Sequence, residues 1–113
     1  MITVKHQAFS KNQNEETHSV ENILRSAGFE QVDSYRYNSA SIRVRVIDAR
    51  FEGLSHVERD TLIEPYLAKL PDDTQADIVT LLALAPSELA PGSKMLRQQL
   101  LNLEFEDPSP SQL

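Results

Sequence analysis

Cysteine is absent from this chain of 113 residues. The absence excludes a disulfide framework, a thiolate metal site and a cysteine nucleophile. No hydrophobic run approaches the roughly 18 apolar residues that a transmembrane helix needs. The first residues, Met1 to Gln7, also lack the apolar stretch of a signal peptide. We therefore expect a cytoplasmic protein from a reducing compartment, with no membrane association.

A surplus of basic charge is lacking too. Lysine and arginine number 11 against 17 aspartates and glutamates, which gives a formal net charge of −6. Because neutralising phosphates takes a surplus of basic residues, the balance argues against general nucleic-acid binding. Hydrophobic residues make up 40% and charged residues 25% of the chain, as is usual for a soluble globular protein, and the length predicts one domain.

The short motifs of common enzyme classes are also missing. The sequence has no G-x-S-x-G nucleophile elbow, no phosphate-binding P-loop and no H-E-x-x-H metal motif. Its three histidines, His6, His18 and His56, show no spacing that would pair a base with a nucleophile. We expect a non-catalytic protein without a resident cofactor.

Helical periodicity is clear in one early segment. From Val20 to Ala27, apolar residues recur at positions i, i+3, i+4 and i+7, which places them on one stripe of a helix. Thr17 or Ser19 can cap its start, and Gly28 stands where a left-handed C-cap belongs. The polar residues 1–16 are predicted to form a flexible arm.

Two strands are predicted next. Residues 31–38 are rich in β-formers, and residues 41–47 alternate apolar side chains with Arg43 and Arg45. The turn at 38–41 predicts an antiparallel hairpin. The alternation predicts a half-buried second strand, whose apolar face meets the core and whose arginine face is solvated.

A second helix begins with a capping box, in which Ser55 is the N-cap and Glu58 the N3 residue. Its expected apolar side consists of Val57, Leu62, Ile63, Tyr66, Leu67 and Leu70. Pro65 should kink or split this helix, and Pro71 should end it. The short apolar run 78–84 predicts a buried strand, parallel to the preceding one through a right-handed crossover.

After that strand, residues 86–89 predict one helical turn, Lys94 to about Asn102 a short helix, and 104–110 an extended acidic tail. The predicted fold class is α+β in the order α-β-β-α-β, a three-stranded mixed sheet with helices on one face, plus a short C-terminal helix. The expected organisation is a flexible arm at 1–16, a domain at 17–90, and a C-terminal helix and acidic tail at 91–113.

The order of elements, together with the stretch from Ile42 to Leu67, resembles the BolA family, whose fold is a variant of the KH fold. The family pattern is an alternating strand, then Phe-x-Gly, then a helix that begins with an apolar residue and Arg. In register with this pattern are Phe51, Gly53, Val57, Arg59, Ile63 and Leu67. A second similar stretch runs from Leu82 to Leu89, so the resemblance covers roughly residues 18–90.

The motif residues have expected roles in the scaffold. Phe51 can plug the junction between sheet and helix. Gly53 would allow a close approach between the strand and the capped helix. Arg59 is long enough to bridge from the helix to carbonyls at the end of a strand.

The resemblance also implies a metal role. In the family, a His follows the helix Arg and is implicated in binding an iron–sulfur cluster shared with a monothiol glutaredoxin. Here that position is Asp60, and a carboxylate is a rarer cluster ligand, so the chain resembles a divergent member. His56 lies one helical turn before Asp60 on the same face. A displaced metal site of His56 and Asp60 is one hypothesis, and an exposed His at a solvated helix start is the other.

Arginine and tyrosine residues gather in the hairpin sequence, namely Arg36, Arg43, Arg45, Arg50, Tyr35 and Tyr37. They predict a surface for nucleic acid or an acidic partner, and the alternative is a solvated sheet face balanced by acidic neighbours. The Gly-x-x-Gly loop of KH-type RNA clamps is absent, because Gly53 has no glycine three residues after it.

The segment 101–108 pairs apolar with acidic residues. We expect it to lie over its own core through Leu103 and Phe105. The alternative is a docking segment for a partner groove or a sheet edge.

These observations favour a regulatory or adaptor module that binds a protein partner, as a monomer or weak homodimer. The resemblance implies links to iron handling, to monothiol glutaredoxins or to stress-linked regulation. One alternative is a nucleic-acid-binding regulator that uses the arginine-bearing sheet face. Another is metal or iron–sulfur binding through His56. The candidate binding residues are Arg36, Arg43, Arg45, Arg50 and Arg59, and the candidate metal residues are His56 and Asp60.

Overall fold

The structure, a computed structural model, describes residues 12–89 and 102–106. Its elements are α2 (Glu15–Ser26), β1 (Gln31–Asn38), β2 (Ser41–Ile47), η1 (Ala49–Phe51), α3 (His56–Leu67), α4 (Asp72–Asp77), β3 (Ile78–Leu84) and η2 (Pro86–Leu89). A short helix at 102–106, which we call the strap, follows. Most of the predicted arm, the predicted helix from Lys94 and the tail beyond 106 lie outside the described residues.

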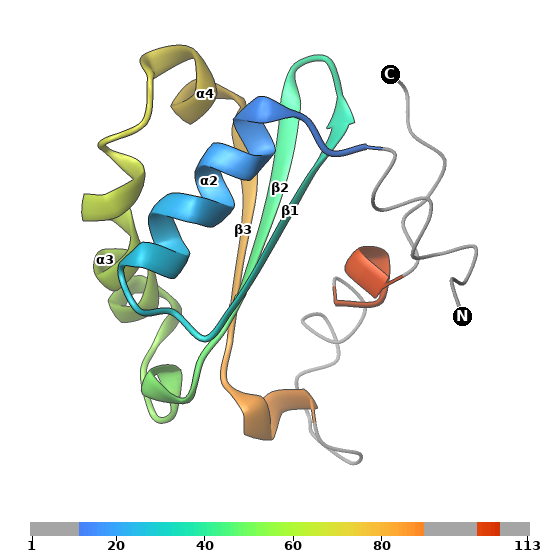
Figure 1. The fold of residues 1–113 in the computed structure, drawn as a ribbon. Helices are drawn as coiled ribbons and strands as arrows, with labels where there is room; N and C mark the ends of the chain where they lie inside the picture. The colour runs from blue at the N-terminus through green and yellow to red at the C-terminus, as the bar shows by residue number, and fades with distance from the viewer. Residues whose placement is uncertain (1–11, 90–101, 107–113) are drawn as a thin grey trace.

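The three strands form one mixed sheet in the order β1-β2-β3 (Figure 1). β1 and β2 are antiparallel, and β2 and β3 are parallel, as the sequence predicts. α2 and α3 lie on one face of the sheet, and the strap lies on the other (Figure 1). The α+β class and the order α-β-β-α-β are therefore confirmed.

The first helix starts earlier than predicted. Its N-cap is Asn14 rather than Thr17 or Ser19. The Asn14 side chain accepts a hydrogen bond from the Thr17 amide at 3.0 Å, and the Thr17 hydroxyl accepts one from the Asn14 amide at 2.9 Å. This reciprocal pair satisfies two backbone donors that the first turn would otherwise leave open. The residues just before α2 are thus part of the folded body.

The end of α2 follows the prediction. Gly28 has a φ of +95°, a conformation that residues with a side chain rarely adopt. The Gly28 amide donates to the Arg25 carbonyl at 2.9 Å, and the Phe29 amide donates to the Leu24 carbonyl at 3.3 Å. This is the Schellman arrangement, which closes the last helical carbonyls and turns the chain toward β1.

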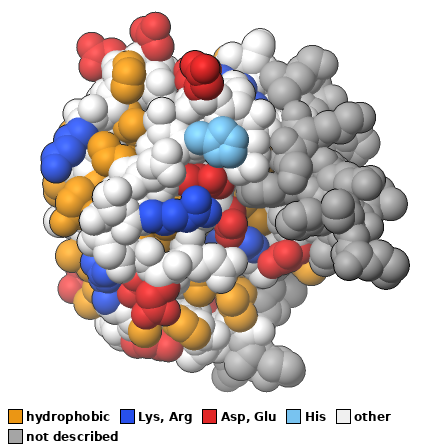
Figure 2. All heavy atoms as spheres, viewed as in Figure 1, with side chains coloured by type: hydrophobic (Ala, Val, Ile, Leu, Met, Phe, Trp, Pro, Cys, Tyr) orange, Lys and Arg blue, Asp and Glu red, His pale blue; other side chains and the backbone are white. Residues whose placement is uncertain are grey.

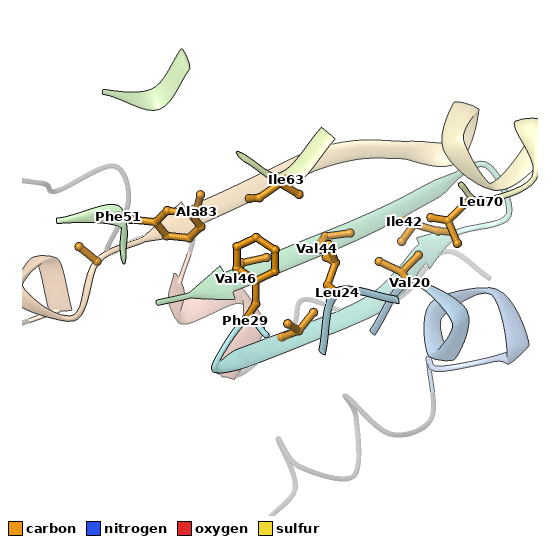
Figure 3. Packing of buried hydrophobic residues seen from close by; sticks show 12 residues of the cluster. Val20, Leu24, Phe29, Ile42, Val44, Val46, Phe51, Ile63, Leu70 and Ala83 are labelled. Carbon is orange, nitrogen blue, oxygen red and sulfur yellow. The ribbon is translucent and has the colours of Figure 1, made fainter. Parts of the chain in front are cut away.

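The main core lies between the sheet and the helices. It consists of Val20, Leu24, Phe29, Val32, Ile42, Val44, Val46, Phe51, Ile63, Leu70, Ala83 and Ala85. Figure 3 shows Phe51, from η1, beside Ala83 of β3 and toward Ile63 of α3. Phe51 is completely buried, so its predicted role as a plug between sheet and helix is confirmed.

The predicted apolar side of α3 is partly wrong. Ile63 is fully buried, but Val57 is 75% exposed and Leu62 39% exposed. At 3.6 residues per turn, these two side chains point about 100° to 120° away from Ile63 around the helix axis. The helix also continues through Pro65 to Leu67 rather than splitting there.

Helix α4 is not predicted from the sequence, since Pro71 is expected to end the helical region. Its six residues, DDTQAD, carry no apolar periodicity. Only Thr74 among them is buried. Such a short polar helix leaves no signal in a hydrophobic pattern.

The arginine face of β2 is not solvated, which corrects the expectation. A second core cluster covers it, made of Tyr35, Ile47, Leu82, Leu84 and Phe105. Phe105 comes from the strap and is 3% exposed, so its predicted packing over the core is confirmed, whereas Leu103 is 60% exposed. Residues 104–106 are helical rather than extended. The alternation of β2 therefore separates two buried faces.

Candidate functional site

Arg59 ties the start of α3 to the end of β3. Its Nη1 donates to the Ala83 carbonyl at 3.0 Å, and its Nε donates to the Leu54 carbonyl at 3.0 Å. Nη1 and Nη2 also donate to the two carboxylate oxygens of Glu88, at 2.6 and 2.9 Å. The predicted bridge from helix to strand end is confirmed, and Arg59 is only 4% exposed. Its role is to hold the scaffold together.

Glu88 is held as a carboxylate in this junction. Burial alone would raise its pKa, but hydrogen bonds from Arg59 and from the Ala85 amide, with the charge of Arg59, lower the pKa on balance. The Ala85 amide donates to Glu88 at 2.8 Å. The pair therefore contributes stability that depends on the ionised form of Glu88.

Gly53 is needed for a different reason from the one expected. A Cβ placed there would meet no atom within 4 Å, so no close approach requires glycine. Its φ is +77°, in the left-handed region that side chains disfavour. The glycine lets the chain turn between η1 and the Ser55 cap of α3, whose predicted capping box with Glu58 is confirmed.

Arg36 lies on the helix side of the sheet, apart from the other candidate arginines. Its Nη2 donates to Glu16 at 2.6 Å and to Asp77 at 2.8 Å. Its side chain is 7% exposed. Arg36 thus joins α2 to α4 and presents almost no charge to solvent.

Arg43 and Arg45 lie together on the opposite face, where the strap covers them. Arg45 pairs with Asp33 on β1 and, at 3.1 Å, with Glu106 of the strap. The Arg43 guanidinium lies 3.9 Å from the centre of the Tyr37 ring. We call the surface made by Arg43, Arg45, Tyr35 and Tyr37 the arginine face. Of the candidate arginines, these two are the ones that the structure brings side by side.

Arg50 lies in a third place. It belongs to η1 and contacts the turn that follows α2. Its Nε contacts Asp48 at 3.2 Å, and its Nη2 donates to the Gly28 carbonyl at 2.7 Å. Burial would raise the pKa of Asp48, but hydrogen bonds from the Arg50 and Glu30 amides and the charge of Arg50 lower it. The predicted arginine cluster is therefore divided among separate parts of the fold.

His56 and Asp60 share one face of α3, as the spacing predicts. His56 is exposed, and Asp60 is partly buried. Across the described ranges, no group of three or more His, Asp or Glu side chains converges as a metal site would require. The structure thus places the two residues one turn apart without a third ligand.

A groove lies between α3, α4 and β3, along the part of α3 that follows its first turn. It has a volume of about 470 Å³ and is lined by Asp60, Glu64, Leu67, Ala68, Gln75, Ile78, Val79 and Leu81. Figure 2 shows hydrophobic side chains reaching the surface among charged ones on the side where α3 and α4 lie. Of these lining residues, the sequence reasoning singled out only Asp60 as a site residue.

The outer edge of β1 is closed by side chains. The Ser34 amide donates to Glu21 at 2.8 Å, and the Ser34 carbonyl accepts from Gln13 at 3.1 Å. The Val32 carbonyl accepts from Arg25 at 2.8 Å. Because these three backbone groups already have partners, this part of the edge is protected against pairing with another strand.

The edge at β3 is blunted in another way. The pairing with β2 shifts register at Val79, since Ile42 faces Ile78 but Arg43 faces Thr80. Further along, Arg59 donates a hydrogen bond to the Ala83 carbonyl. Irregular pairing and a charged side chain at the edge both discourage strand addition. A partner at this side would therefore use the groove side chains.

No family model, curated protein or solved structure matches the chain. The resemblance to the BolA family therefore stays a prediction. No described helix is long and apolar enough to cross a membrane.

Proposed function

We propose that this chain is a non-catalytic protein-binding module, and that the groove between α3, α4 and β3 receives a partner segment with basic and apolar side chains. The observation that carries the proposal is the combination of exposed Val79 with the carboxylates of Asp60 and Glu64. The proposal agrees with the adaptor role that the sequence favours.

The apolar part of the groove gives a partner something to bury. Val79 is 61% exposed, and Leu67, Ile78 and Leu81 beside it are partly buried. Covering such side chains is favourable by about 25 cal/mol for each Å² of apolar surface. Exposed apolar groups with a polar rim are typical of sites where proteins meet.

The carboxylates of the groove favour a partner segment with positive charge. Asp60 and Glu64 are spaced i, i+4, so both carboxylates lie on one side of α3. Since the chain also has a net charge of −6, a basic segment is attracted. A second copy at the same groove would bring like charges together. The occupant that fits is therefore a basic segment of another protein.

The resemblance to the BolA family bears on this groove at one position. Asp60 stands where the family carries its cluster-binding His, and Asp60 lines the groove. Where the family has an imidazole, this chain therefore offers a carboxylate for contact with a protein. A monothiol glutaredoxin is the partner that the resemblance implies, and a basic segment on its surface is the feature this groove requires.

The alternative of nucleic-acid binding has less support. Arg36, Arg45 and Arg59 are 6%, 4% and 4% exposed, and each contacts at least one carboxylate. Phosphate binding needs accessible cations. The four hairpin arginines lie in three separate places, so they do not form one basic surface.

The proposal is tested by fluorescence anisotropy with the labelled peptide KLKVKL and its charge-reversed counterpart ELEVEL. The full chain should bind the first and not the second. Val79→Ser should weaken binding by about fivefold, because it removes roughly 1 kcal/mol of apolar contact. Val57→Ser is the matched control, since Val57 is 75% exposed, somewhat more than Val79, but lies outside the groove.

The charge is tested separately. Glu64→Gln should weaken binding of KLKVKL by up to about fivefold, as an exposed ion pair allows. Glu30→Gln, which removes an exposed carboxylate elsewhere, should leave it unchanged. Equal losses in Val79→Ser and Val57→Ser, or in the two glutamine variants, would show diffuse attraction to an acidic protein and would contradict the proposal.

A further inference from the structure

The strap presents two carboxylates to the arginine face. Glu104 accepts a hydrogen bond from Arg43 Nη1 at 3.3 Å, and Glu106 accepts one from Arg45 Nη1 at 3.1 Å. The Asn102 side chain accepts a second hydrogen bond from Arg45, at 2.7 Å. Each carboxylate of the strap therefore contacts one arginine, and Arg45 pairs with Asp33 as well.

Between the two carboxylates, Phe105 supplies the apolar contact. Its ring meets the Tyr35 ring edge to face, with centroids 5.3 Å apart, and the Arg45 guanidinium lies 5.2 Å from its centre. Phe105 is 3% exposed, whereas Leu103 on the same short helix is 60% exposed. The strap therefore places an aromatic ring between two carboxylates on this face.

The arginine face is also held by contacts that do not involve the strap. Arg45 also pairs with Asp33, and Arg43 also donates to the Tyr35 hydroxyl at 2.9 Å and lies over Tyr37. These contacts come from β1, which the strap does not form. A surface whose side chains are already held in place binds a ligand with less loss of conformational freedom.

Among residues 102–106 of the strap, Phe105 is the buried one. The side chains of Glu104 and Glu106 are 33% and 45% exposed, and ion pairs this open to water contribute little. Because the strap belongs to the same chain as the face, it gains its occupancy from a high effective concentration. A separate segment with the same groups can therefore compete for the face.

We propose that the arginine face is a second docking surface, for an acidic partner segment that carries an aromatic residue between two carboxylates. The strap occupies the face until such a partner displaces it. A protein segment fits better than a nucleic acid, because Asp33 stands beside Arg45 and the segment that occupies the face in the structure is a peptide with two carboxylates. This surface lies across the sheet from the α3 groove and is independent of it.

The test uses the full chain and a labelled peptide, LNLEFED, that copies the strap. Phe105→Ala should release the strap and bind the peptide at least about tenfold more tightly than the unchanged chain, in which the tethered strap competes. Leu103→Ala is the matched control within the strap and should behave as the unchanged chain. LNLEAED, without the aromatic residue, should bind neither.

The face itself is tested by Arg43→Gln in the Phe105→Ala chain, with circular dichroism to confirm folding. Arg43 has a side chain 23% exposed, so its replacement perturbs the core less than that of Arg45. Peptide binding should fall by up to about fivefold, as loss of one solvent-open ion pair allows.

Three results would overturn the proposal. One is no gain in peptide binding on Phe105→Ala. Another is capture of a single-stranded oligonucleotide in place of the peptide. The third is a concentration-dependent dimer of the unchanged chain that Phe105→Ala dissociates, because a second copy would then be the occupant.

Discussion

Replacing Arg59 by methionine should destabilise the fold more than any other single arginine change. Arg59→Met keeps the length of the side chain but removes four hydrogen bonds, one to Leu54, one to Ala83 and two to Glu88. It also removes the guanidinium that faces Glu88, whose side chain is 13% exposed. The junction between α3 and the end of β3 then loses these four polar contacts.

The size of the effect follows from burial. Removing one member of a buried ion pair costs about 3 to 5 kcal/mol. A native domain is stable by about 5 to 15 kcal/mol, so the loss is a large fraction of the whole. With about 4 °C for each kcal/mol in a domain of this length, the melting temperature should fall by roughly 15 °C.

The assay is urea unfolding followed by circular dichroism, with Arg25→Met as the matched control. Arg25 has a side chain 51% exposed, and its loss should cost at most about 1 kcal/mol. The double change Arg59→Met with Glu88→Gln should be less harmful than the sum of the single changes, by about 2 kcal/mol. A loss below about 1 kcal/mol for Arg59→Met would refute the reasoning.

Three further predictions concern the scaffold. Gly53→Ala should cost about 1 kcal/mol through its positive φ alone, and Gly53→Asn less, because asparagine tolerates that region; equal urea midpoints for both variants would contradict this. Asn14→Ala should cost about 1 kcal/mol by removing the N-cap of α2, and Asn14→Ser should restore most of it, as thermal unfolding can measure. The folded pKa of Glu88 is below its ordinary 4.5, so its contribution is complete above that value and is lost as the pH falls through the folded pKa. The stability gap to Glu88→Gln should therefore shrink on acidification, and a gap that widens would show that the carboxylate is not the stabilising form.

Most of the fold can be predicted from local patterns in the sequence. The bounds of the three strands follow from period-two alternation and apolar runs, and the capping box at Ser55 marks the start of α3. Arg59 is reachable from sequence because its length and place beside the cap limit what it can touch. α4 could not be predicted, because its six residues, five of them polar, have no apolar periodicity to detect.

The surfaces depend on contacts that sequence does not display. The alternation of β2 shows that Arg43 and Arg45 share a face, but not that the strap covers it from 61 residues further along the chain. Val79 belongs to an apolar run and gives no sign that its side chain faces solvent. The groove depends on how α3, α4 and β3 pack, and the separate places of Arg36 and Arg50 depend on the same packing.

The central claim is that the α3 groove receives a basic and apolar partner segment. Its most direct test is an amide NMR titration of the nitrogen-labelled full chain with KLKVKL. We predict that the shifts concentrate at Glu64, Val79 and Leu81, while the amides of Arg43 and Arg45 stay in place. Shifts spread over all acidic surfaces, centred on the arginine face, or absent altogether would contradict the claim.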